Sequence, residues 1–140
     1  MLEEPEQSLK NGQENKEKVA TKFLFIDDNI GLLRGLQRAF AQNPNVIFAE
    51  CRSVEDAFRA IAEHQPGIVF LDHHLSDFGD EGFEVAEKIN QNIADSALAK
   101  RVKIYSTTSD TVAAQEYQKR GIENIRKSDL EKFKAIIAAK

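Results

Sequence analysis

The sequence of 140 residues has little of several features that whole classes of protein require. It contains one cysteine, Cys51, which excludes an internal disulfide, a CxxC redox motif and a zinc ribbon, since each of these needs at least two cysteines. It also lacks an excess of positive charge, because its formal net charge is −4. We therefore expect no general electrostatic attraction to nucleic acid or to an anionic membrane surface.

Long apolar runs and recognisable targeting segments are missing too. No run approaches the roughly 20 apolar residues that a membrane-spanning helix needs. The N-terminus carries acidic residues in place of the basic segment and apolar core of a secretory signal peptide. Neither a G-x-G-x-x-G motif nor a P-loop follows the first apolar run, which disfavours a nucleotide-binding fold. We expect a cytoplasmic protein.

The composition is that of a soluble globular protein, with 41% hydrophobic and 30% charged residues. Residues 1–20 are rich in Glu, Gln, Asn and Lys and offer almost nothing to bury, so they predict a disordered polar tail. A docking segment is the less favoured alternative for this stretch. Residues 21–140 have the length of one ordinary domain.

Within that domain, short apolar runs alternate with helical apolar spacing. Five strands are predicted, at residues 23–26, 46–49, 67–71, 102–105 and about 122–126. The helices between and after them are predicted at about 30–42, from 54, from about 83 to 93, from 111 to a C-terminal glycine at 121, and from about 129. Ser53 with Asp56 and Ser128 with Glu131 are the expected N-terminal caps of two of these helices. This alternation predicts a parallel sheet covered by helices on both faces.

Polar side chains follow four of these strands at the point where each strand ends. Asp27 and Asp28 end the first strand, and Asp72 ends the third, which is a fully apolar run. Ser106 ends the fourth strand, and Lys127 follows the fifth. Open parallel sheets bind their ligands at the carboxyl ends of the strands, so we expect these side chains to share one site.

These five residues, in this order and at these strand ends, resemble the receiver domain of two-component response regulators over about residues 21–140. The resemblance implies a flavodoxin-like doubly wound α/β fold with a five-stranded parallel sheet of order 2-1-3-4-5. It implies a single-domain signalling phosphoacceptor, not an enzyme, that at most dephosphorylates itself slowly. Its implied partners are a histidine kinase or a histidine phosphotransfer protein and an unknown downstream protein, with a possible homodimer through the face of the fourth helix, fifth strand and fifth helix.

The resemblance also implies a role for each matching residue. Asp72 is the expected phosphoacceptor, because carboxylates act as nucleophiles that form acyl phosphates. Mg²⁺, a hard cation that prefers oxygen ligands, is the expected cofactor, held by Asp27, Asp28, Asp72 and the backbone carbonyl of His74. Lys127 is expected to contact a phosphoryl oxygen, and the hydroxyl of Ser106 to bind another and so move its loop.

The chain departs from the family pattern at three places. Ser76 and Ser128 stand where the family usually has proline, and Asn124 stands where it usually has a Tyr or Phe that rotates on activation. The usual coupling between the hydroxyl and an aromatic ring is therefore in question. These departures keep open a second reading, in which the domain is a pseudo-receiver that binds partners without being phosphorylated.

A third reading comes from Asp72-His73-His74, which spells the Asp-His-His of a metal-dependent phosphoesterase family. That family also needs a D-x-D pattern and a second domain, and Asp27-Asp28-Asn29 does not supply the pattern. Neighbouring histidines at a strand end do not readily face one metal ion, so a solvated or hydrogen-bonded role is expected for them.

Overall fold

The computed structural model describes residues 21–73, 75 and 102–140. The predicted tail, the predicted helix at about 83–93 and His74 lie outside the described residues. The helices, strands and contacts of the fold are those of these described residues.

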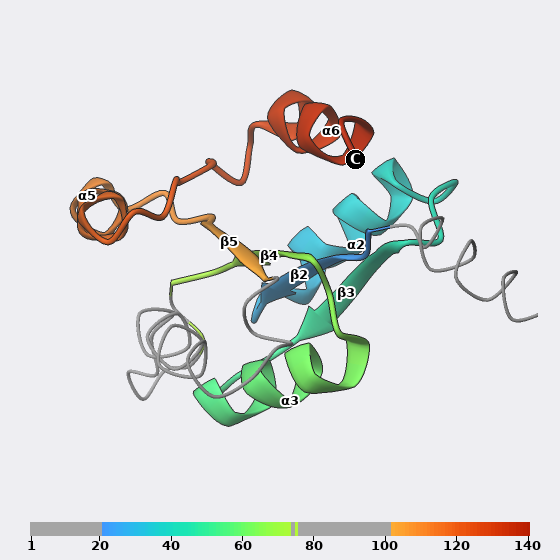
Figure 1. Cartoon of the computed structure of the whole chain (residues 1–140), viewed down its shortest axis with the longest axis horizontal. Coiled ribbons are helices and arrows are strands. Elements are labelled where there is room, and N and C mark those ends of the chain that lie inside the picture. Colours follow the sequence, from blue (N-terminus) through green and yellow to red (C-terminus); the bar gives the residue numbers. More distant parts are fainter. Residues whose placement is uncertain (1–20, 74, 76–101) are drawn as a thin grey trace, which may run out of the picture.

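A parallel sheet forms the centre of the fold (Figure 1). Its strands are β2 (Phe23–Asp27), β3 (Val46–Glu50), β4 (Ile68–Leu71) and β5 (Lys103–Ser106). Their order is β3-β2-β4-β5, and every neighbouring pair is parallel. This agrees with the first four places of the predicted order 2-1-3-4-5, so the doubly wound fold class is confirmed.

The predicted fifth strand is shorter than expected. Where residues 122–126 pass β5, the described chain forms one parallel bridge, between Ser106 and Asn124. Two backbone hydrogen bonds hold it: the Ser106 amide donates to the Glu123 carbonyl at 3.0 Å, and the Ile125 amide donates to the Ser106 carbonyl at 2.8 Å. The segment therefore takes the fifth place in the sheet order without becoming a full strand.

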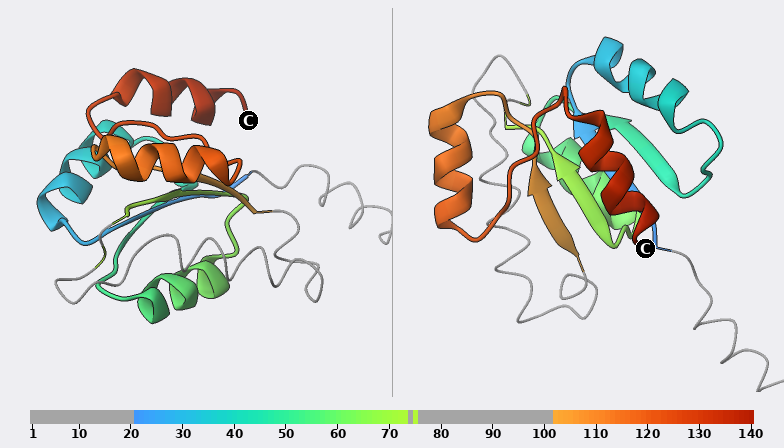
Figure 2. Two further views of the ribbon diagram at one scale, coloured as in Figure 1. Left: turned by 90° about the vertical axis from the view of Figure 1, so that its left-hand side faces the viewer. Right: turned by 90° about the horizontal axis from the view of Figure 1, so that it is seen from above.

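Helices cover both faces of the sheet (Figure 2). The helix α2 (Ile30–Ala39) and the closing helix α6 (Leu130–Ala138) lie over one face, and α3 (Val54–His64) lies under the other. The helix α5 (Thr111–Lys119) lies beside the β5 edge. The helix α2 ends at Ala39, before the predicted residue 42, and Phe40 is its C-terminal cap residue. None of the described helices is long and apolar enough to cross a bilayer.

The strands are apolar on both sides because successive side chains point to opposite faces of a sheet. On β2, Phe23 and Phe25 enter the core beneath α2 and α6, while Leu24 and Ile26 enter the core above α3. The first of these cores is aromatic: the ring of Phe25 stacks on that of Phe70 at 4.5 Å and meets the edge of Phe133 at 5.2 Å. This aromatic layer adjoins the strand ends that carry the polar side chains, because Phe25, Phe70 and Phe133 line one pocket with Asp27 and Lys127.

One of the two predicted helix caps is correct. Ser53 caps α3, since its side chain accepts a hydrogen bond from the Asp56 amide at 3.0 Å. The prediction for Ser128 was wrong, because Asp129 caps α6 by accepting from the Lys132 amide at 3.2 Å. The Asp129 amide donates to the Arg126 carbonyl at 2.9 Å, so Ser128 lies inside a turn and the helix begins one residue later than expected.

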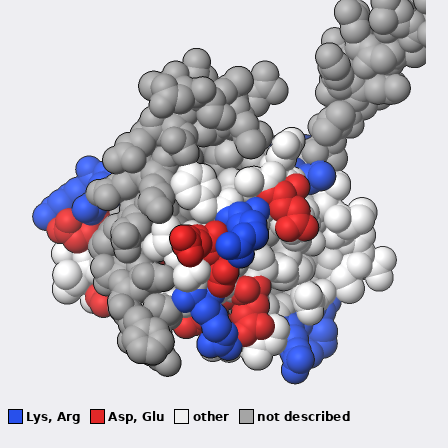
Figure 3. Space-filling model, turned by 90° about the horizontal axis from the view of Figure 1, so that it is seen from below, with Lys and Arg blue, Asp and Glu red and all other residues white. Residues whose placement is uncertain are grey.

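The face that carries α3 has charges of both signs mixed together (Figure 3). Arg59 pairs with Asp56 at 3.2 Å on α3, and Arg52 pairs with Glu50 at 2.7 Å near its start. These pairs are largely exposed, so each contributes at most about 1 kcal/mol to stability. Over the described residues of this face, neither sign forms a continuous patch.

Two glycines offer a test of the helix assignments. Gly121 follows α5 with φ of +79°, which an L-residue with a side chain adopts only with strain, whereas Gly35 lies inside α2, where an added methyl group would meet open space. We expect Gly121→Ala to lower the free energy of unfolding by about 1 kcal/mol and Gly35→Ala to raise it by about 0.5–1 kcal/mol. Urea unfolding of both variants checks this, and a change of the same sign in both would contradict the assigned backbone conformations.

Candidate functional site

The carboxyl ends of β2, β4 and β5 bring the predicted polar side chains to one edge of the sheet. Backbone hydrogen bonds that continue past the strands align these ends: the Asp72 amide donates to the Ile26 carbonyl and the Thr107 amide to the Leu71 carbonyl, both at 3.0 Å. Asp27, Asp72 and Ser106 are almost fully buried there, each with at most 3% of its surface exposed. Polar side chains that are so deeply buried need hydrogen-bond or ion-pair partners within the protein.

Lys127 supplies a partner for two of the acids. Its Nζ lies 2.8 Å from Oδ1 of Asp72 and 3.1 Å from Oδ2 of Asp27. The second oxygen of Asp27 accepts a hydrogen bond from the Asn29 amide at 2.9 Å. Asn29 in turn caps α2 through the Leu32 amide, so Asp27 also fixes the start of that helix.

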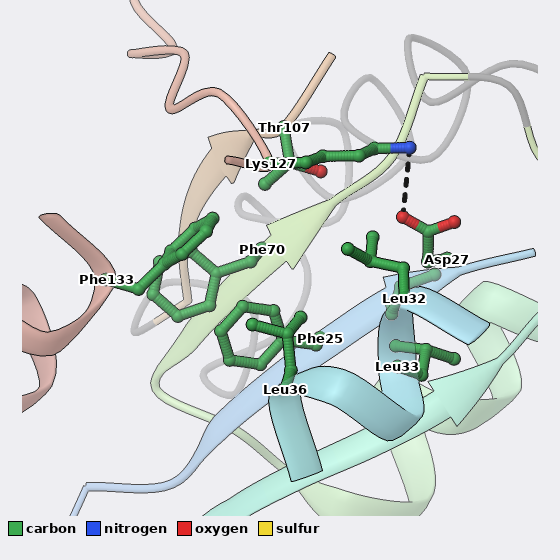
Figure 4. A pocket seen from close by; sticks show the side chains of 10 residues that line it. Phe25, Asp27, Leu32, Leu33, Leu36, Phe70, Thr107, Lys127 and Phe133 are labelled. Carbon is green, nitrogen blue, oxygen red and sulfur yellow. Dashed lines mark ion pairs between the residues drawn. The ribbon is translucent and has the colours of Figure 1, made fainter. Parts of the chain in front are cut away.

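The electrostatics of the site follow from its apolar base. Figure 4 shows the lysine chain reaching to Asp27 at one side of an apolar pocket that Phe25, Phe70 and Phe133 help to line. Burial raises the pKa of Asp72 above its ordinary value, although the hydrogen bond and charge of Lys127 act in the opposite direction. Burial and the nearby Asp72 charge likewise raise the pKa of Asp27. For Lys127, burial opposes the charged form, but the hydrogen bonds and charges of Asp72 and Asp27 outweigh it and raise its pKa. At neutral pH the site is thus a crowded group of acids that one lysine partly neutralises.

The acids are close enough together to share a cation. Asp27, Asp28 and Asp72 each offer a carboxylate oxygen, and these oxygens lie within 4.8 Å of one another. Asp28 is half-buried, unlike the other two, so this corner of the site is open to solvent. An all-oxygen set with an open side fits a hard divalent cation such as Mg²⁺, which keeps several waters when it binds.

Ser106 lies at the neighbouring strand end, but its hydroxyl is engaged elsewhere. Its Oγ donates to Oδ1 of Asn124 at 2.7 Å. The same amide oxygen accepts from the Thr108 amide at 3.0 Å, and Nδ2 of Asn124 donates to the Thr108 carbonyl at 3.0 Å. The sequence marked Asn124 as a departure from the family, but it contained no signal that this side chain would hold Ser106.

A second polar contact beside Asp72 was also missed. His73 is buried, and its Nδ1 lies 3.2 Å from the hydroxyl of Tyr117 on α5. The two rings meet edge to face, with centroids 5.6 Å apart. His73 therefore has the hydrogen-bonded role that the sequence allowed, but nothing in the sequence pointed to Tyr117. His74, whose carbonyl is an expected metal ligand, lies outside the described residues.

Comparison with known proteins identifies relatives over most of the chain. A family model described as the response regulator receiver domain matches residues 23–137. The sensory transduction protein LytT of Bacillus anthracis is 31% identical over 107 residues, which cover 76% of this chain and 41% of that protein. LytT of Enterococcus faecalis is 30% identical over 96 residues, or 68% of this chain and 37% of that protein. The chain thus spans about two fifths of the length of these relatives.

Solved structures show the same fold. Response regulator protein TrrA of Thermotoga maritima, in complex with Mg²⁺ and BeF, matches with a TM-score of 0.66 at 21% identity, covering 85% of this chain and 97% of that one. A co-crystal structure of the Saccharomyces cerevisiae phosphotransfer protein Ypd1 with the receiver domain of Ssk1 matches with a TM-score of 0.66 at 16% identity, covering 84% of this chain and 86% of that one. At these identities the structures show the fold alone, whereas the family model and the LytT relatives show family membership. The chain belongs to the response regulator receiver domain family of two-component signalling proteins.

Proposed function

We propose that the chain takes a phosphoryl group from a histidine kinase or a histidine phosphotransfer protein onto Asp72 and thereby changes its contacts with other proteins. One observation carries the proposal: a buried carboxylate at a strand end lies 2.8 Å from a lysine ammonium and beside two further acids. Because a buried acid cluster is unfavourable for folding, its presence favours a role in chemistry.

In the proposed reaction an oxygen of Asp72 attacks the phosphorus of a phosphohistidine. The new O–P bond forms as the N–P bond to the donor breaks, and the donor imidazole keeps the electron pair. Lys127 supports this step because its ammonium already lies at Asp72 and can share its charge with a phosphoryl oxygen. Such a transfer needs positioning and charge neutralisation more than covalent chemistry from the protein.

The charge that Lys127 leaves uncompensated is the reason to propose a Mg²⁺ site. Asp27, Asp28 and Asp72 are its proposed side-chain ligands, together with the carbonyl of His74. Bound Mg²⁺ supplies positive charge that offsets the repulsion between the acids and the incoming phosphoryl oxygens. Asp27 has a second proposed role, because its carboxylate also pairs with Lys127 and bonds the Asn29 amide at the start of α2.

The partner is proposed from the chemistry of the donor. The structure of Ypd1 with the Ssk1 receiver is one in which a receiver of this fold meets a phosphotransfer protein. For output, and for a possible homodimer, we propose the face made by α5, residues 122–126 and α6, which corresponds to the fourth helix, fifth strand and fifth helix of the family. Val112 on α5 leaves 69% of its surface exposed, which suits a protein contact.

Labelling with a small phosphodonor tests the proposal against its alternative, a pseudo-receiver that is not phosphorylated. Incubation with acetyl phosphate and Mg²⁺ should add one phosphoryl group, as seen by intact mass spectrometry, and chelation of Mg²⁺ should prevent it. A protein that gains no mass under these conditions but still binds partners would favour the pseudo-receiver.

Replacement of Asp28 separates metal binding from folding. Lys127 contacts Asp27 and Asp72, so Asp28→Ala removes a repelling charge and leaves both ion pairs in place. Without metal, we expect the free energy of unfolding to stay within about 0.5 kcal/mol of the wild type or to rise. In the wild type, Mg²⁺ at ten times its dissociation constant should add about 1.4 kcal/mol, and Asp28→Ala should lose this gain.

Thermal unfolding with and without Mg²⁺ measures both effects. Glu63→Ala is the matched control, since it removes an exposed acid on α3 and should keep the Mg²⁺ response. A marked loss of metal-free stability in Asp28→Ala would show instead that Asp28 belongs to a structural ion pair.

A further inference from the structure

The side chain of Asn124 holds both ends of the tripeptide that follows β5. It accepts hydrogen bonds from the Ser106 hydroxyl at 2.7 Å and from the Thr108 amide at 3.0 Å, and it donates one to the Thr108 carbonyl at 3.0 Å. Ser106, Thr107 and Thr108 each have at most 4% of their surface exposed, so water does not compete for these groups. One carboxamide therefore satisfies three polar groups of a buried loop.

The direction of the bond to Ser106 follows from the other two. The Thr108 amide can only donate and its carbonyl can only accept, so the oxygen of Asn124 must face the first and its nitrogen the second. The Ser106 hydroxyl meets the oxygen, which is only an acceptor, so Ser106 must be the donor.

A hydroxyl has one proton to donate. If Ser106 donates it to Asn124, it cannot donate it to a phosphoryl oxygen on Asp72 at the same time. We propose that Asn124 is a positioning residue that holds the Ser106 hydroxyl in the resting protein and releases it only when a phosphoryl group competes for its proton. The proposal rests on the proposed role of Asp72 and goes beyond it, because it names the group that the phosphoryl oxygen must displace.

The remaining bonds of Asn124 make it suited to this exchange. After Ser106 leaves, the carboxamide keeps both bonds to Thr108, so the loop stays attached while the serine turns. A phenylalanine or an aliphatic side chain at this position could neither accept a hydrogen bond from Ser106 nor bond to the backbone of Thr108. The switch of this chain is thus a polar exchange between two acceptors.

A double-mutant cycle on Ser106 and Asn124 tests the exchange, with Mg²⁺ and beryllofluoride as the probe of the phosphorylated state. In the wild type, the Ser106 hydroxyl exchanges its bond to Asn124 for a bond to the probe. In Asn124→Leu it has no bond to Asn124 to give up, so probe binding adds a hydrogen bond. Calorimetric titration should therefore show that Ser106→Ala weakens probe binding about fivefold more in the Asn124→Leu background than in the wild type, the size of one hydrogen bond between neutral groups. Asn124→Asp keeps an acceptor for the Ser106 hydroxyl but loses the donor to the Thr108 carbonyl, so Ser106→Ala should weaken probe binding less in this background than in Asn124→Leu.

The control is Asn43→Leu, which removes a bond to the Asn45 amide at 2.9 Å, remote from the site, and should leave the Ser106→Ala penalty unchanged. Additive effects of Ser106→Ala and Asn124→Leu would overturn the proposal while leaving the phosphoacceptor role of Asp72 intact. Failure of the wild type to bind the probe would overturn both.

A second measurement needs no change at Asn124. In Ser106→Ala the Asn124 carboxamide has no serine hydroxyl to bond, and in the probe-bound wild type the hydroxyl has moved to the probe. The Asn124 side-chain NMR signals of these two proteins should therefore resemble each other. Unchanged Asn124 signals on probe binding would overturn the exchange even if the Asn124 variants do not fold.

Discussion

Asp72→Asn is expected to abolish phosphoryl uptake completely while the domain stays folded. The amide has nearly the shape of the carboxylate but is not a nucleophile. Burial raises the pKa of Asp72, which means that its charged form is unfavourable in the folded protein. The amide therefore removes this desolvation cost at the same time as it weakens the bond to Lys127. The free energy of unfolding at neutral pH should therefore change by no more than about 1 kcal/mol.

Intact mass spectrometry after treatment with acetyl phosphate and Mg²⁺ measures the loss. Asp56→Asn is the matched control, because it makes the same chemical change at a partly exposed aspartate on α3 and should label as the wild type does. Equal labelling of Asp72→Asn and wild type would show that another residue is the acceptor.

Lys127→Met is expected to give the largest loss of stability among substitutions in the site. The thioether chain keeps the packing over the apolar base but leaves Asp27 and Asp72 without their shared cation. Removing one partner of a fully buried pair costs about 3–5 kcal/mol. The side chain of Lys127 is 29% exposed, so we expect a smaller loss of about 2–3 kcal/mol at neutral pH.

The loss should depend on pH in a definite direction. Burial raises the pKa of both acids, and in the variant the opposing effect of Lys127 is gone, so the folded state holds their protons more tightly than the unfolded state does. The stability of such a protein falls as pH rises through the raised carboxyl pKa values. The deficit of Lys127→Met relative to wild type should thus be greatest at neutral pH and shrink as the pH is lowered towards the ordinary carboxyl pKa of about 4.

Urea unfolding at several pH values measures this. Lys132→Met is the control, since Lys132 pairs with Glu123 at 2.7 Å but both side chains are about half exposed, and such surface pairs contribute at most about 1 kcal/mol. If Lys127→Met cost no more than Lys132→Met and showed no pH dependence, the buried ion pairs would not hold the site together.

The sheet and the gathering of acids at one edge could be predicted because both depend on local patterns. An apolar run such as residues 68–71 predicts a buried strand, and parallel strands place their carboxyl ends together, so Asp27 and Asp72 had to be neighbours. The Ser53 cap was predictable for the same reason, because its partner lies three residues away.

Contacts between distant segments, and competition between adjacent residues, could not be predicted. The bond from Ser106 to Asn124 spans 18 residues, and that between His73 and Tyr117 spans 44. Ser128 and Asp129 are both good capping residues, and the turn back to Arg126 decides between them. The predicted fifth strand is reduced, among the described residues, to the bridge between Ser106 and Asn124.

The central claim is that Asp72 carries an acyl phosphate, and trapping that group on the wild-type protein tests it most directly. After labelling with acetyl phosphate and Mg²⁺, borohydride reduces an aspartyl phosphate to homoserine, and peptide mass spectrometry then reads which position was converted. We predict homoserine at position 72 and nowhere else, dependent on Mg²⁺. Conversion at another aspartate, or none at position 72 in a protein that has gained phosphoryl mass, would contradict the account.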